Sequence, residues 1–250
     1  MENPKIALVT GAGKRLGRAI AEGLARDGYV MALHYNASSA GAKSLADAIR
    51  AEGGRADCIR QDLSEPGTAG DLISRASAAL GGPVSVLVNS ASAFDTDNLE
   101  TLSERSWHFL MNVNAAAPAF LMQAFARQTP YPAEGSIINM LDTQMTSASP
   151  DRFSYFCSKY ALDGAMRLAA YELGSRGTTV NAIAPGLILP SDQSQEDFDR
   201  RQALTPRGPG LGPADVVGAV RYFLEARHVT GHTLVVDGGQ RLMGFGNAIS

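Results

Sequence analysis

Residues 6–17 read Ile-Ala-Leu-Val-Thr-Gly-Ala-Gly-Lys-Arg-Leu-Gly, so a short apolar run leads directly into a glycine-rich turn. Residues 15–27 then carry apolar side chains at three- and four-residue spacing, which predicts a helix with one apolar face. Glycines let the backbone approach a pyrophosphate, and the unpaired N–H groups of a helix N-terminus point at it. The same spacing also fits an ordinary tight turn, but its place after the first strand favours dinucleotide binding.

The alternation of strand-like and helix-like segments continues along the chain. Apolar runs rich in Val, Ile and Leu predict strands at residues 6–10, 29–35, 56–61, 84–89, 136–141, 179–184 and 233–236. Helical periodicity predicts helices at residues 15–27, 40–52, 66–80, 103–128, 151–175 and 213–226. We therefore expect an α/β fold: a single doubly wound Rossmann-type domain over residues 1–250, with a seven-stranded, mostly parallel sheet.

Residues 187–213 break this rhythm with several prolines and glycines around a polar segment, residues 193–202, which could be helical. Long connections in compact domains are often lids over a site. Because no second domain is predicted, the substrate site has to be built from loops. We expect residues 187–213 to form a substrate lid.

Composition excludes several classes of protein. The 250 residues are 45% hydrophobic and 19% charged, which is ordinary for a globular chain, and the net charge of −3 comes without a basic stripe for nucleic acid. The sequence shows neither a signal peptide nor a run of about 18 apolar residues, so we expect a soluble cytoplasmic protein without a membrane partner. The two cysteines lack metal-ligand spacing, and no metal site is expected.

The end of the second predicted strand bears on the choice of cofactor. Residues 33–37, Leu-His-Tyr-Asn-Ala, include no acidic side chain that would bind the adenosine ribose of NAD. Donors and positive charge for a 2′-phosphate are nearby: Lys14, Arg15, His34, Tyr35 and Ser39. NADPH is therefore the expected cofactor, although His34 and Tyr35 could merely cap the sheet edge and Arg15 could be solvated.

A candidate catalytic pair lies in the helix predicted at residues 151–175. Tyr155 and Lys159 are four residues apart, so they share one helix face at about 6 Å. An ammonium near a phenol is expected to lower the phenol pKa from roughly 10 and make Tyr155 a usable acid. Asp142 follows the strand predicted at residues 136–141, where doubly wound folds place functional groups, although it could instead make a turn or pair with Arg152 or Lys159.

Together these motifs resemble the short-chain dehydrogenase/reductase family over nearly the whole chain, and within it the pteridine reductases and bacterial dihydromonapterin or dihydrofolate reductases. The family turn Thr-Gly-x-x-x-Gly-x-Gly corresponds to residues 10–17, with Arg15 in place of the middle glycine. The sequence Asn-Ser-Ala-Ser at residues 89–92 replaces the usual Asn-Asn-Ala-Gly, and Asn114 matches the active-site asparagine. The resemblance implies that the cofactor is bound by Gly11, Arg15, Leu16, Gly17, His34, Tyr35, Ser39, Asp62, Leu63, Asn89, Ser90, Ala91, Tyr155, Lys159, Pro185 and Gly186.

Two further features of this resemblance concern the substrate. Most of the family has serine thirteen residues before the tyrosine, whereas this chain has Asp142, as the pteridine reductases do. A carboxylate would repel a developing alkoxide but can accept from a ring N–H or, if protonated, donate through water. Phe94 stands where the resembled enzymes stack a flat pterin on the nicotinamide, although an isolated phenylalanine after a strand is usually a core residue.

The expected activity is NADPH-dependent reduction of a dihydropterin or dihydrofolate. Tyr155 would donate the proton, Lys159 would hold the nicotinamide ribose, Asp142 would orient the heterocycle, and Asn114 would keep Lys159 and the proton path in place. Two alternatives remain open: a ketone or 3-oxoacyl reductase of the same family, and a non-catalytic dinucleotide-binding sensor or scaffold. The resemblance also implies a homotetramer, paired through the helices predicted at residues 103–128 and 151–175 and through the C-terminal strand region.

Overall fold

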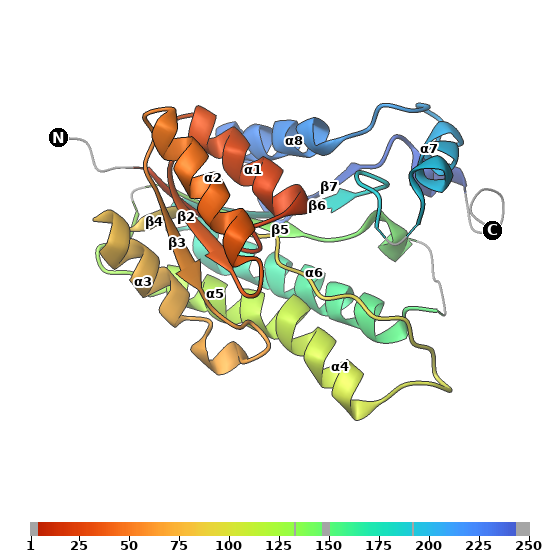
Figure 1. Cartoon of the computed structure of the whole chain (residues 1–250). Coiled ribbons are helices and arrows are strands. Elements are labelled where there is room, and N and C mark those ends of the chain that lie inside the picture. Colours follow the sequence, from red (N-terminus) through yellow and green to blue (C-terminus); the bar gives the residue numbers. More distant parts are fainter. Residues whose placement is uncertain (1–4, 133, 147–150, 192, 244–250) are drawn as a thin grey trace.

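A seven-stranded parallel sheet forms the centre of the molecule in a computed structural model that describes residues 5–132, 134–146, 151–191 and 193–243 (Figure 1). The strands are β1 (Ile6–Val9), β2 (Val30–Tyr35), β3 (Ala56–Arg60), β4 (Val84–Asn89), β5 (Gly135–Met140), β6 (Thr178–Pro185) and β7 (Thr233–Val236). Their bounds differ from the predicted ones by no more than one residue at either end. The order β3-β2-β1-β4-β5-β6-β7 reverses between β1 and β4, and such a switch point opens a crevice at the carboxyl ends of the strands.

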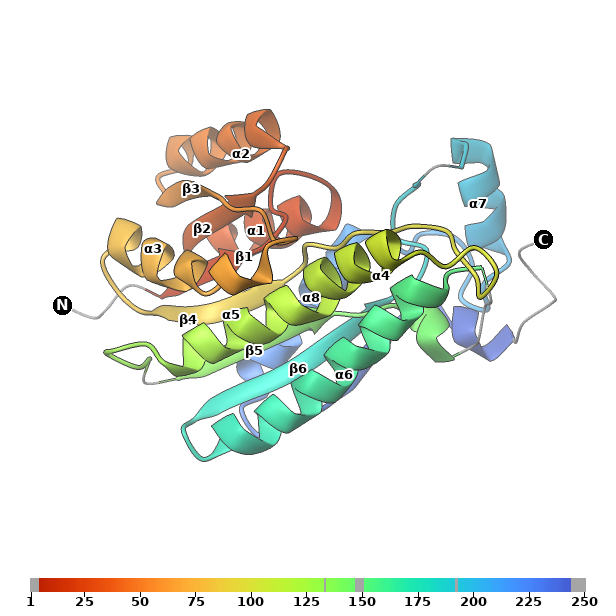
Figure 2. The same cartoon turned by 90° about the horizontal axis from the view of Figure 1, so that it is seen from below.

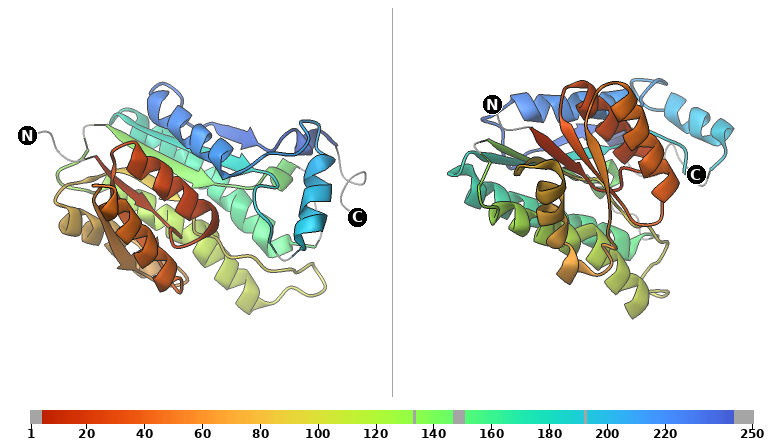
Figure 3. Two further views of the ribbon diagram at one scale, coloured as in Figure 1. Left: turned by 45° about the horizontal axis from the view of Figure 1, so that its top comes forward. Right: turned by 60° about the vertical axis from the view of Figure 1, so that its left-hand side comes forward.

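Helices cover both faces of the sheet, as Figures 1 and 3 show. One face carries α1 (Arg15–Arg26), α2 (Ser39–Ala51) and α8 (Pro213–Glu225), and the other carries α3 (Asp71–Leu80), α5 (Ala117–Ala126) and α6 (Phe153–Gly174). Two apolar cores result, one on each side. Strands buried on both faces need apolar residues at every position, which explains why β1 reads Ile-Ala-Leu-Val and is buried throughout. The predicted Rossmann-type fold is confirmed, and every strand pair is parallel.

The long helix predicted at residues 103–128 is divided into three parts. Helix α4 (Glu104–Met111) passes through a π-helical turn, η2 (Asn112–Ala116), into α5, and Figure 2 shows α4 and α5 lying beside α6. Such turns often occur at functional sites, and this one contains the buried Asn114. By length and hydropathy alone, residues 104–126 would also suffice to cross a membrane. Here the stretch packs on the sheet through fully buried residues such as Leu121 and Phe125.

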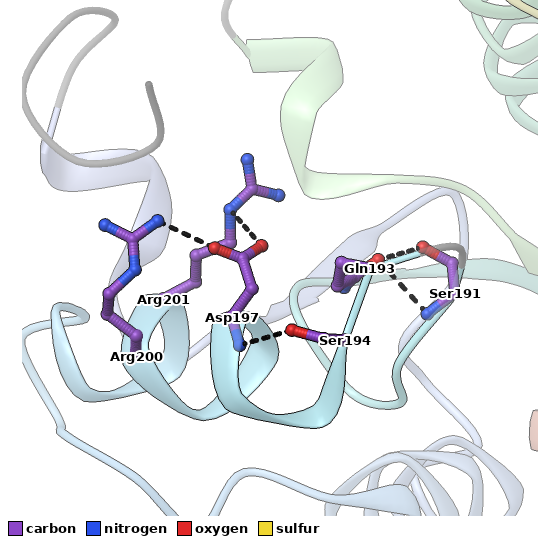
Figure 4. Close-up of polar contacts among 6 residues, drawn as sticks. All are labelled: Ser191, Gln193, Ser194, Asp197, Arg200 and Arg201. Carbon is purple, nitrogen blue, oxygen red and sulfur yellow. Dashed lines mark hydrogen bonds and ion pairs between the residues drawn. The ribbon is translucent and has the colours of Figure 1, made fainter.

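The segment predicted as a lid contains a helix, α7 (Gln195–Ala203), which confirms the helical expectation for its polar part. Ser194 caps this helix by accepting a hydrogen bond from the Asp197 N–H, and the Asp197 carboxylate pairs with Arg200 and Arg201 (Figure 4). Gln202 is buried, and its amide group joins the two ends of the segment. It donates to the carbonyl oxygens of residues 187 and 211 at 2.9 and 2.6 Å and accepts from the N–H of residue 210 at 3.0 Å.

Candidate active site

A cleft of about 530 Å³ runs along the carboxyl ends of the strands, from the glycine-rich turn to the end of β5. The predicted residues that line it are Gly11, Arg15, Leu16, Gly17, His34, Asp62, Leu63, Ser90, Ala91, Asp142, Tyr155, Lys159, Pro185 and Gly186. The other predicted residues do not line it: Tyr35, Ser39, Asn89, Phe94 and Asn114. Lys14, predicted as a phosphate donor, also lines it, and so do Asn36 and Ser38, which the sequence did not single out. The cleft therefore unites the two groups predicted for the dinucleotide and for catalysis.

The turn after β1 is packed so closely that two of its residues must be glycine. A Cβ atom at Gly13 would lie 2.4 Å from the Ser38 hydroxyl oxygen, and one at Gly17 would lie 2.4 Å from the Gly11 carbonyl oxygen. Thr10, directly after β1, joins the turn to the segment after β4, because its hydroxyl oxygen accepts from the N–H groups of Ser90 and Ala91 at 2.9 Å. This geometry leaves bare backbone facing the cleft, as a pyrophosphate requires.

Arg15 adopts the left-handed backbone conformation, with φ of 52°, at the position where the resembled family has glycine. Its guanidinium donates to the carbonyl oxygen of Pro190 at 2.5 Å and to that of Leu189 at 3.5 Å. The side chain thus joins the phosphate turn to the beginning of the predicted lid. Its contact with a 2′-phosphate stays a prediction.

The structure corrects the role predicted for His34. The ring is 2% exposed, its Nδ1 accepts from the Gly11 N–H at 3.1 Å, and its Nε2 lies 3.0 Å from the Gln61 carbonyl oxygen. Burial lowers the His34 pKa from 6.5 to about 4, so the ring is neutral at pH 7. A neutral ring with both nitrogens engaged positions the glycine-rich turn and offers neither charge nor a free donor to a phosphate.

Asn89 is also placed differently from the prediction. Its side chain is 2% exposed and donates from Nδ2 to Oδ1 of Asn139 on the neighbouring strand β5, at 2.9 Å. The amide group therefore lies within the sheet. The adjacent residues Ser90 and Ala91 are the ones that face the cleft.

Tyr155, Lys159 and Asp142 lie together, as we predicted from the position of Asp142 after β5 and of Tyr155 and Lys159 near the start of α6. The Tyr155 hydroxyl donates to Oδ2 of Asp142 at 3.0 Å. The Lys159 ammonium donates to the carbonyl oxygen of Met140 at 2.9 Å and lies 5.6 Å from the centroid of the Tyr155 ring. Oδ1 of Asp142 accepts from the Gln144 N–H at 2.8 Å, so this carboxylate both forms a turn and holds the phenol.

The expectation that Lys159 lowers the Tyr155 pKa is wrong for this arrangement. Burial raises the pKa of Tyr155 well above 10, and the charge and hydrogen bond of Asp142 add to that rise. Burial also lowers the Lys159 pKa from 10.5 to about 8, with Asp142 acting in the opposite direction. At pH 7 the phenol is therefore neutral and the ammonium is charged.

Asn114 connects the loop after β4 to α6. Its Oδ1 accepts from the Ala93 N–H at 2.8 Å, and its Nδ2 donates to the Ser158 hydroxyl at 3.0 Å. Ser158 is adjacent to Lys159, so Asn114 steadies the helix turn that carries the lysine.

Phe94 lies at the edge of the site and is 48% exposed. Its ring meets Tyr155 edge to face, with centroids 5.1 Å apart.

The crevice, the glycine turn and the Tyr155–Lys159 pair define a class of protein, the dinucleotide-binding oxidoreductases of doubly wound fold. Residues 11–241 match the family described as enoyl-(acyl carrier protein) reductase. Pteridine reductase 1 of Leishmania tarentolae is 36% identical, over 95% of this chain and 96% of its own length. The 3-oxoacyl-(acyl-carrier-protein) reductase FabG of Staphylococcus epidermidis is 30% identical, over 94% and 98%.

A solved structure agrees with these sequence relatives. FolM alternative dihydrofolate reductase 1 from Brucella canis, complexed with NADP, superposes with a TM-score of 0.91 at 35% identity, over 98% of this chain and 97% of that one. The chain belongs to the short-chain dehydrogenase/reductase family.

Proposed function

We propose that this protein is an NADPH-dependent reductase of a dihydropterin or dihydrofolate. The observation that carries the proposal is the 3.0 Å hydrogen bond from the Tyr155 hydroxyl to Asp142, which puts a carboxylate beside the proton donor. A carboxylate there suits a nitrogen heterocycle, because it can accept a hydrogen bond from a ring N–H. The similarity to a pteridine reductase and to a FolM dihydrofolate reductase supports the same substrate class.

The residues of the cleft fit NADPH as the cofactor. The glycine-rich turn leaves backbone open to a pyrophosphate, and Lys14, Asn36 and Ser38 line the cleft near the end of β2, where a 2′-phosphate would need charge and donors. The similar FolM structure contains NADP. When bound, NADPH supplies the hydride for the reaction.

The candidate catalytic residues would have separate roles in proton transfer, cofactor binding and substrate orientation. Tyr155 gives its proton to the ring nitrogen next to the reduced carbon, directly or through water. Lys159, whose ammonium is charged at pH 7, holds the nicotinamide ribose by hydrogen bonding. Asp142 orients the heterocycle, and Phe94 offers a ring on which a flat substrate can stack. Residues 187–213 act as the substrate lid.

A ketone or 3-oxoacyl reductase is the second candidate, and the similarity to FabG favours it. Against it stands Asp142, whose charge would repel the alkoxide that forms during carbonyl reduction. NADPH oxidation measured in parallel with dihydropterins, dihydrofolate, ketones and a 3-oxoacyl thioester separates the two, with NADH as the cofactor control. Turnover confined to carbonyl substrates would refute the pterin proposal, and tight NADPH binding without any turnover would favour a sensor or scaffold.

We also propose that the protein works in the cytoplasm as a homotetramer. Exposed apolar side chains on α4, α5 and α6 support the pairing of subunits through these helices: Phe109, Phe120, Leu168 and Tyr171. Light scattering after gel filtration measures the mass directly. A monomer at micromolar concentration would contradict the proposal.

A further inference from the structure

Arg152 joins three segments that carry the site. It precedes α6 directly, three residues before Tyr155, and its Cζ lies 4.7 Å from the centroid of the Phe94 ring. Its Nη1 donates to Oε1 of Gln144 at 2.9 Å. Phe94 follows β4, and Gln144 belongs to η3 (Thr143–Thr146), which follows β5. One guanidinium therefore links the loops after two neighbouring strands to the start of the catalytic helix.

These contacts form a closed ring around the catalytic pair. From Gln144 the backbone N–H donates to Oδ1 of Asp142 at 2.8 Å, and the other carboxylate oxygen accepts from Tyr155 at 3.0 Å. The Tyr155 ring meets Phe94 at 5.1 Å with an interplanar angle of 66°. Phe94 in turn contacts the Arg152 guanidinium. The guanidinium closes the ring, because its contacts with Phe94 and Gln144 are the two steps of the ring that involve neither Asp142 nor Tyr155.

The backbone that carries Arg152 is itself fixed. Asp97 pairs with Arg152 in a single parallel β-bridge, and its carbonyl oxygen accepts from the Phe153 N–H at 3.0 Å. The Asp97 carboxylate is buried and accepts from the N–H of Ser154 at 3.0 Å and from the hydroxyl of the same serine. Asp97 thus caps α6 from outside the helix. The guanidinium extends from a rigid start, which lowers the entropy cost of holding it over Phe94.

We propose that Arg152 is a positioning residue that keeps the Phe94 ring in place as the stacking platform for a flat substrate. Phe94 is 48% exposed, so packing against the core holds it weakly and the cation–π contact matters more. Arg152 acts through Phe94 and Gln144 and does not touch the reacting atoms. The inference rests on the proposed function, since the platform has a role only if the substrate is a flat ring.

A double-mutant cycle between Arg152 and Phe94 tests this role. Arg152→Met should raise the KM for the dihydropterin about threefold, in keeping with a partly exposed cation–π contact, and leave kcat within about twofold. Phe94→Leu should raise KM by more, and adding Arg152→Met to it should cause no further rise. Arg152→Lys keeps a cation but loses the planar group that reaches Gln144, so it should restore part of the KM effect. Arg167→Met, on the exposed side of the same helix, is the matched control.

The outcomes separate the inference from the function on which it rests. If the wild type reduces dihydropterins and the two KM effects multiply independently, the positioning role is wrong. A fall in kcat and thermal stability without a change in KM would also overturn it, because that pattern indicates a purely structural residue. If the wild type reduces no dihydropterin, the proposed function fails and the inference fails with it. Where Arg152→Met does not fold, the cycle with Arg152→Lys gives the same decision.

Discussion

Replacing Lys159 by methionine should make the protein more stable at pH 7 while removing its turnover. The ammonium is 2% exposed, and its hydrogen bond goes to the Met140 carbonyl oxygen. Among the residues that the structure describes, no carboxylate forms an ion pair with it. Burial lowers its pKa from 10.5 to about 8, and the charge of Asp142 offsets only part of that fall. In the proposed reaction this charge holds the nicotinamide ribose, so its loss should remove turnover.

The size of the gain follows from the pKa. A fall from 10.5 to about 8 corresponds to roughly 3 kcal/mol of lost folding stability, at about 1.4 kcal/mol for each pKa unit. Methionine has a similar shape and needs no hydration, but it leaves the Met140 carbonyl without its donor, at a cost of about 1 kcal/mol. We therefore expect Lys159→Met to raise the free energy of unfolding by about 2 kcal/mol at pH 7.

The pH dependence gives the sharper test. A lysine whose pKa is lower in the folded chain binds its proton more weakly there, so its penalty is complete below pH 8 and disappears between about pH 8 and 10.5. Urea unfolding of the wild type and the variant across this range measures the difference. Lys43→Met, at an exposed position on α2, is the control and should change stability by less than about 0.5 kcal/mol. A Lys159→Met variant that is no more stable at pH 7, or whose gain does not change with pH, would refute this reasoning.

Three other substitutions have expected results. Tyr155→Phe should lower kcat by about 100- to 10,000-fold, as expected for a lost general acid, without changing the NADPH dissociation constant; stopped-flow turnover and fluorescence titration measure the two, and an unchanged kcat would exclude Tyr155 as the acid. Burial lowers the His34 pKa from 6.5 to about 4, so the wild type should lose up to roughly 3 kcal/mol as the pH falls through that window, and urea unfolding should show that His34→Gln does not. Gln202→Leu removes three hydrogen bonds that join the ends of the lid segment. It should raise the substrate KM and speed proteolysis within residues 187–211, and unchanged rates of cleavage would show that the Gln202 hydrogen bonds do not hold the segment together.

The sheet could be predicted closely from the sequence because strands buried on both faces leave an unmistakable apolar run. The division of the helix at residues 103–128 could not, because a π-helical turn is one extra residue in a helical bond pattern and leaves the apolar spacing nearly unchanged. Asn114 lies within that turn and is buried. The family resemblance could assign Asn114 to the candidate site, but it could not show which atoms Asn114 would hold.

The catalytic groups could likewise be located from the rule that functional side chains follow strand ends, but their electrostatics could not. Helical spacing placed Lys159 near Tyr155 and suggested a lowered phenol pKa. The pKa rises instead, first because the phenol is buried and then because Asp142 lies beside it with its charge and hydrogen bond, and neither is encoded in residue spacing. Residue spacing was equally insufficient for His34. The sequence predicted a phosphate donor at a strand end, whereas the ring is buried and bonded to Gly11 and Gln61 from two other segments.

The raised pKa of Tyr155 also bears on the choice between the two candidate substrates. When the Tyr155 phenol gives up its proton, a negative phenolate forms beside the Asp142 carboxylate. That step needs another group to compensate the new negative charge. Reduction of a carbonyl creates an alkoxide next to Asp142, so two negative charges would meet in a buried site where their repulsion is largest. Reduction of an imine in a heterocycle develops charge on a ring nitrogen, while a neighbouring ring N–H can donate to Asp142 and replace the hydrogen bond that Tyr155 withdraws. The contact that opposes carbonyl chemistry is thus one that a pterin-like ring can use.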